Sequence, residues 1–98
     1  QHFMHRARYN RLISAVLDHP QLIGVGIDEE TALLVRADGQ WEVLGNYYVK
    51  IFDARRAQIV DDRGPMAKAA DIRMHVLPEG GVFEPRRRRV EFQEVNIP

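Results

Sequence analysis

The stretch Leu22-Ile23-Gly24-Val25-Gly26-Ile27 is a continuous apolar run, broken only by glycine. A short run of this kind is typical of a β-strand that is covered on both faces. Its two glycines permit close approach of another segment or a bend. The acidic residues Asp28-Glu29-Glu30 follow directly. They therefore lie at the carboxyl end of the predicted strand, where open α/β sheets collect catalytic and ligand-binding groups.

An amphipathic helix is predicted upstream of this strand, over about residues 5–18. Its apolar residues recur at spacings of three and four, and they are Tyr9, Leu12, Ile13, Val16 and Leu17. His19-Pro20 ends the helix, because the residue before a proline is pushed out of the α region. Arg8 and Arg11 share one flank of the helix, about 60° apart.

Segments with high β-propensity follow the strand. Residues 31–35 and 41–44 are predicted to form a hairpin around Asp38-Gly39, which is a strong hairpin signal. We expect residues 47–52 to add a third strand and extend the meander. The combination of a helix with several strands fits a fragment of an α/β protein or a small α+β module.

The second half of the chain is less regular. Residues 55–70 are predicted to form a loop that can include a short helical turn, with Gly64-Pro65 as a breaker. Residues 72–77 alternate in polarity and are interpreted as a late strand, which the turn at 78–81 ends. Residues 90–95 are a last alternating segment.

Composition limits the function classes. The chain has 98 residues, of which 45% are hydrophobic, and this length and composition indicate one domain or a part of one. Fourteen basic and fourteen acidic side chains give no net charge, which disfavours nucleic acid or anionic lipid as a partner of the whole molecule. The absence of cysteine excludes disulfides and thiol nucleophiles. No apolar run is long enough to cross a bilayer, so a soluble chain is expected.

Candidate nucleophiles and metal ligands are scarce. Ser14 is the only serine, and it lies beside the apolar stripe without a base at helical reach, so we do not expect it to act as a nucleophile. Three of the four histidines lack the spacing of metal ligands, so no metal site is predicted; they are His5, His19 and His75. The chain opens on Gln1-His2-Phe3 without an initiator methionine, and we expect it to be part of a longer protein.

Two blocks carry a family resemblance. The first is Gln1-His2-Phe3 followed by Arg6, Arg8 and Arg11, and the second is Gly24-Val25-Gly26-Ile27-Asp28-Glu29. In order and spacing they resemble the C-terminal portion of cyanophycinases, a group of serine peptidases. The segments Glu42-Val43-Leu44-Gly45 and 77–83 look like later parts of the same family, so the resemblance extends to about Phe83.

The resemblance implies the C-terminal portion, residues 1–98, of a single doubly wound α/β domain like that of class I glutamine amidotransferases. It also implies a Ser-His-Glu triad, in which His2 is the general base and Glu29 the orienting acid, with Asp28 as the competing acid. The serine would lie upstream, in a Gly-x-Ser-x-Gly elbow that this chain lacks. Such chemistry requires neither a metal nor an organic cofactor.

The implied substrates contain aspartyl or β-aspartyl peptide bonds, as in cyanophycin, a poly-aspartate backbone that carries arginine on its side chains. Guanidinium groups bind carboxylates through paired hydrogen bonds, so the implied substrate-binding residues suit this chemistry. They are Gln1, Arg6, Arg8 and Arg11. The implied partner is the N-terminal part of the same protein, and the family is compatible with a cytoplasmic location and a homodimer. No nucleic-acid or membrane partner is expected.

Two other interpretations remain open. The chain can come from a degenerate, non-catalytic relative, or it can be a small module that binds acidic ligands through its arginines. The run Arg86-Arg87-Arg88-Arg89 is flanked by acidic residues, which favours a solvated or subunit-contacting strand over a phosphate-binding one.

Overall fold

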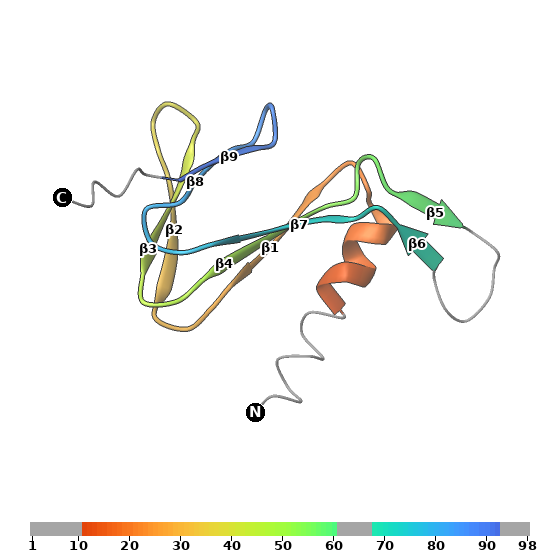
Figure 1. The fold of residues 1–98 in the computed structure, drawn as a ribbon, viewed down its shortest axis with the longest axis horizontal. Helices are drawn as coiled ribbons and strands as arrows, with labels where there is room; N and C mark the ends of the chain where they lie inside the picture. Colours follow the sequence, from red (N-terminus) through yellow and green to blue (C-terminus); the bar gives the residue numbers. More distant parts are fainter. Residues whose placement is uncertain (1–10, 61–67, 93–98) are drawn as a thin grey trace. The chain divides into compact units, whose positions relative to one another are not determined.

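The structure is a computed structural model that describes residues 11–60 and 68–92 of the chain. A helix covers residues 11–18. The strands that follow it are shown in Figure 1: β1 (Ile23–Ile27), β2 (Thr31–Val35), β3 (Trp41–Gly45), β4 (Val49–Asp53), β5 (Gln58–Val60), β6 (Lys68–Ala70), β7 (Arg73–Leu77), β8 (Val82–Glu84) and β9 (Arg89–Glu91).

These strands are arranged in three sheets, with the orders β1-β4-β7, β2-β3-β8-β9 and β5-β6. The contacts between residues divide the chain into two compact units. One unit is formed by Gln1–Gly26 and Ile51–Met74, and the other by Ile27–Lys50 and His75–Pro98. The combination of a helix with several strands is compatible with the predicted α/β class.

The core of the first unit joins the helix to the end of β4. Val16 is buried against Phe52 and Ala54, and the partly buried Leu12, Ile13, Leu17 and Ala57 pack around them. The predicted apolar stripe is thereby confirmed, except for Tyr9, which lies outside the described residues. The last helical residue is Asp18, as His19-Pro20 predicted.

Gly24 of β1 lets the helix pack closely against the strand. A Cβ atom at this position would collide with Cγ2 of Val16 and would lie 3.2 Å from Cδ1 of Leu12. This confirms the expected close approach. The prediction that β1 is covered on both faces was wrong for the described chain, because Ile27 at its end is exposed, as is Leu22 just before it.

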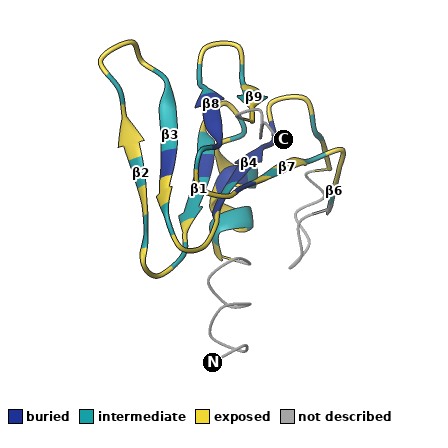
Figure 2. Cartoon of the chain, turned by 60° about the vertical axis from the view of Figure 1, so that its left-hand side comes forward, coloured by how far each residue is buried: buried dark blue, intermediate teal, exposed yellow. Residues whose placement is uncertain are grey.

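The core of the second unit lies between β3, β8 and the ends of β4 and β7 (Figure 2). Its fully buried side chains include Val43, Val49, Leu77 and Phe83. The predicted hairpin is confirmed: β2 and β3 are antiparallel, with Thr31 opposite Gly45 and Val35 opposite Trp41. In this sheet β2 is an edge strand, and its Leu34 and Val35 are 47% and 64% exposed.

The β2-β3 register continues past the end of the hairpin. The amide of Asn46 donates to the Glu30 carbonyl at 3.0 Å, and the amide of Asp28 donates to the Tyr48 carbonyl at 3.1 Å. Both pairs keep the alignment of the β2-β3 ladder, because the two residue numbers of each opposing pair add up to the same total throughout. Residues 28–35 and 41–48 therefore form one antiparallel ribbon, which is bent where Glu30 and Gly45 adopt positive φ values of 55° and 116°.

The observed ribbon differs from the meander predicted for residues 31–52. The strand expected over residues 47–52 is β4, which begins at Val49 and lies in the sheet β1-β4-β7. The reason is that residues 46–48 do not reverse the chain: they remain opposite residues 28–30, so β4 follows β3 along the same ribbon. A meander would require a turn there.

One further expectation needs revision. The loop predicted over residues 55–70 contains the antiparallel pair β5 and β6, with Ile59 opposite Ala69. Strands of three residues are too short for a local pattern to reveal, because the cross-strand partner stabilises them. The strand expected over 72–77 is confirmed as β7. The turn after it is confirmed too, because the Gly81 amide donates a hydrogen bond to the Pro78 carbonyl at 2.9 Å. Of the segment 90–95, residues 93–95 lie outside the described residues.

Replacing Gly45 by alanine is expected to destabilise the protein by about 3 kcal/mol or more. The positive φ alone costs a side chain about 1–2 kcal/mol, and a Cβ atom there would also collide with the Glu30 carbonyl and with Thr31 Cα at 2.8 Å. Gly39→Ala is the matched control: φ is 86°, but nothing lies within 4 Å of the added carbon, so a loss of about 1 kcal/mol is expected. Urea unfolding of both variants measures the difference, and equal losses would contradict the packing constraint at Gly45.

Candidate functional site

The structure describes two of the six predicted site residues, Arg11 and Glu29. The other four, Gln1, His2, Arg6 and Arg8, lie outside the described residues. Arg11 belongs to the unit that contains the helix, and Glu29 to the unit that contains the bent ribbon.

Glu29 lies in the turn between β1 and β2, and the backbone of this turn is held from the opposite side of the ribbon. The hydroxyl of Thr31 donates to the Glu29 carbonyl at 3.0 Å and accepts the amide of Tyr47 at 3.1 Å. Next to it, the Glu30 carboxylate accepts a hydrogen bond from the Asn46 side-chain amide at 3.1 Å. The turn is thus fixed by its neighbours, while the Glu29 side chain is exposed.

The Glu29 carboxylate is available for a partner. Within residues 11–60 and 68–92 it makes no hydrogen bond and no ion pair. A carboxylate that orients a catalytic imidazole needs an oxygen free to accept the ring N–H. The side chain of Glu29 meets that requirement.

Asp28, the competing acid, is already engaged in structural contacts. Its Oδ2 accepts the Tyr48 amide at 3.2 Å, and its Oδ1 lies 3.8 Å from Lys50 Nζ. The side chains of Asp28 and Lys50 are only 20% and 25% exposed. These contacts hold the ribbon in register, so the geometry favours Glu29 over Asp28 as the acid that can serve a ligand or a second catalytic group.

Arg11 is exposed in the first turn of the described helix. The neighbouring Leu12 packs into the core of the unit, which fixes the rotation of the helix. The Arg11 guanidinium makes no ion pair with the described part of the chain. As far as the described residues are concerned, it can therefore bind a carboxylate from another molecule or segment. Ser14 is also exposed on this helix.

One buried polar group was not singled out by the sequence. His75 of β7 has its ring centroid 5.9 Å from that of Phe83, and its Nε2 atom is buried without a hydrogen-bond partner among the described residues. The apolar residues on either side of it, Met74 and Val76, are exposed. The strand thus places the histidine, not these apolar residues, toward the core, which local alternation could not reveal.

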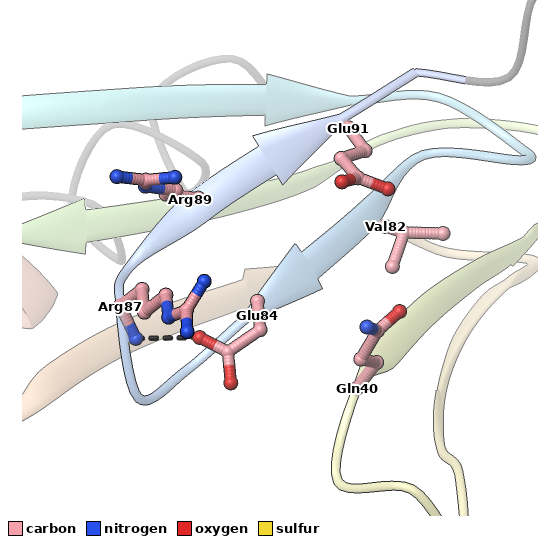
Figure 3. A pocket seen from close by; sticks show the side chains of 6 residues that line it. All are labelled: Gln40, Val82, Glu84, Arg87, Arg89 and Glu91. Carbon is pink, nitrogen blue, oxygen red and sulfur yellow. Dashed lines mark hydrogen bonds between the residues drawn. The ribbon is translucent and has the colours of Figure 1, made fainter.

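A second feature missed by sequence reasoning is a hollow on the hairpin β8-β9 (Figure 3). It is lined by Gln40, Val82, Glu84, Arg87, Arg89 and Glu91. The charged residues Glu84, Arg89 and Glu91 next to apolar ones were the available signal, but only the hairpin register shows that they share one face. No group of three His, Asp or Glu residues suited to a metal ion occurs in the described ranges. In those ranges no helix has the length and apolar character required to cross a membrane.

Comparison with known proteins gives a consistent result. The chain is 40% identical to a cyanophycinase of Synechococcus elongatus, over 95% of this chain and 30% of that protein. It is 38% identical to a cyanophycinase of Trichormus variabilis and 36% identical to one of Geminocystis herdmanii, over 92% and 82% of this chain. The chain spans about a third of the length of these relatives. No protein-family model matches the chain. The resemblance drawn from the two sequence blocks is confirmed.

Asp28→Asn is expected to lower the free energy of unfolding by about 1 kcal/mol, because the neutral amide loses the charged hydrogen bond to Tyr48 and the attraction to Lys50. Glu29→Gln is expected to change it by less than about 0.5 kcal/mol, since the exposed side chain has no described partner. Chemical unfolding of the two variants tests the assignment. A larger loss for Glu29→Gln would show that Glu29, not Asp28, is the structural acid.

Proposed function

We propose that this chain is the C-terminal portion of a serine-type peptidase that degrades cyanophycin, and that it contributes the base and the acid of the catalytic triad. The observation that carries the proposal is the similarity to cyanophycinases over nearly the whole chain, including the Gly-Ile-Asp-Glu block. The available carboxylate of Glu29 supports it, because that residue matches the acid of the triad in the resemblance.

In the proposed reaction, a serine outside this chain attacks the carbonyl of an aspartyl or β-aspartyl peptide bond. The imidazole of His2 takes the hydroxyl proton as the Oγ–C bond forms, and it passes this proton to the departing amine as the C–N bond breaks. Water then attacks the acyl ester, gives one proton to His2, and the serine oxygen recovers that proton as the acid product leaves. Glu29 holds the ring tautomer and stabilises the imidazolium.

The arginines of the N-terminal segment are proposed to position the substrate. Arg6, Arg8 and Arg11 recur on one short stretch, with Gln1 next to the proposed base. Guanidinium groups form paired hydrogen bonds with carboxylates, which a substrate rich in aspartate and arginine carries in abundance. The exposure of Arg11 and its lack of an ion pair among the described residues support a role in binding.

The proposal also includes the rest of the domain. The N-terminal part of the same protein would carry the serine in a strand–turn–helix elbow and complete a doubly wound sheet like that of class I glutamine amidotransferases. Exposed apolar residues on the strands support this partner: Ile27 ends β1, and Met74 and Val76 lie on β7. An apolar strand such as β1 is usually covered on both faces when a parallel sheet is complete.

Glu29→Gln is expected to lower the kcat for cyanophycin hydrolysis by roughly 10⁴-fold, because a triad without its carboxylate loses the correct tautomer of the base. Glu30→Gln is the matched control: it changes the adjacent carboxylate, whose partner Asn46 can still donate to an amide oxygen, so activity should stay within about twofold. Turnover by both purified variants, with unfolding curves to verify the fold, gives the comparison. Equal activities would remove the role assigned to Glu29.

A serine-directed phosphonate is expected to label the protein that carries this chain, at a residue outside these 98 positions. His2→Ala should abolish both labelling and turnover, because the nucleophile needs its base. Ser14→Ala should leave both unchanged. Peptide mass analysis of the labelled protein locates the modified residue, and a label on Ser14 would overturn the proposal.

A further inference from the structure

The hairpin β8-β9 has two faces of opposite character. Its register places Phe83 opposite Val90, and Phe83 is fully buried with its ring 5.5 Å from that of Trp41. The alternate residues form the other face, where Glu84 lies opposite Arg89 and Val82 opposite Glu91. The apolar contact with Trp41 therefore fixes which face of the hairpin carries its charged residues.

Charged residues line this hollow without forming ion pairs with one another in the described chain. Glu84, Arg87, Arg89 and Glu91 line it, together with Gln40 from the start of β3 (Figure 3). Oppositely charged residues on facing strands commonly pair. Here no ion pair within 4 Å joins any of the four in the described chain, and the Glu84 carboxylate instead accepts the backbone amide of Arg87.

The arrangement of charges restricts what can bind. Arg87 and Arg89 supply two guanidinium forks for a carboxylate. Glu84 and Glu91 supply acceptors for a cation, and the Gln40 amide can donate or accept. A ligand that carries only negative charge, such as a nucleic-acid backbone, would be repelled by both carboxylates. A ligand that carries only positive charge would leave both guanidinium groups without an anionic partner.

We infer that this hollow binds a zwitterionic ligand that carries both a carboxylate and a guanidinium or ammonium group, as in a free basic amino acid or a short basic peptide. None of the lining residues belongs to the predicted catalytic or substrate-binding set, and the inference does not depend on the proposed peptidase activity. The neighbouring Arg86 is exposed but does not line the hollow.

The test uses L-arginine as the probe, titrated into the whole protein that carries this chain. Binding is followed by the backbone amide shifts of Gln40 and residues 82–91, so that arginine bound elsewhere does not contribute. Saturable shifts are expected at millimolar concentrations. Agmatine, which lacks the carboxylate, and glutarate, which lacks the cation, should each bind at least tenfold more weakly.

Variants assign the two charge contacts. Arg89→Gln and Glu91→Gln should each weaken L-arginine binding at least tenfold, while Arg86→Gln should leave it within twofold. All three side chains that are changed are exposed, so the fold should be retained, and amide spectra of the free variants verify this. The inference is overturned if L-arginine causes no shifts in this region, if agmatine or glutarate binds as well as L-arginine, or if Arg86→Gln weakens binding as much as Arg89→Gln.

Discussion

The register of the bent ribbon is the constraint on which the second unit depends. Residues 28–35 and 41–48 keep one antiparallel alignment through a bend, although Glu30 and Gly45 leave the strand conformation. The contacts that span the bend are polar: Asp28 accepts the Tyr48 amide, and Glu30 accepts from both the backbone and the side chain of Asn46. Because every side chain on a strand changes face when the register slips by one residue, these contacts decide which residues reach the core.

The same constraint separates the roles of three adjacent acids. Asp28 and Glu30 are used to hold the bend, and Glu29 between them is left with an exposed carboxylate. Such a position suits a functional acid, because its backbone is fixed while its side chain can still accept a hydrogen bond. The structural and the proposed catalytic role are thus divided between neighbouring residues.

Local pattern predicted the elements whose signals lie within a few residues. The helical stripe at Leu12 and Val16, the hairpin around Asp38-Gly39 and the strand ending at Leu77 all agree with the structure. The partner of β4 and the pair β5-β6 could not be predicted, because pairing depends on residues far away along the chain. For the site, the sequence blocks identified Glu29, whereas its advantage over Asp28 became visible only from the hydrogen bonds of Asp28. The hollow at Arg89 required the hairpin register.

The edge strand β2 has a practical consequence for anyone producing this chain. Its sequence Thr31-Ala32-Leu33-Leu34-Val35 carries no charge and no proline, and two of its apolar side chains are largely exposed. Natural proteins usually protect such edges with lysine, proline or a covering segment, because an open ladder of amides and carbonyls recruits strands from other molecules. Expression of these residues alone therefore invites intermolecular β-pairing and inclusion bodies, and a lysine at position 34 would act as a gatekeeper against aggregation.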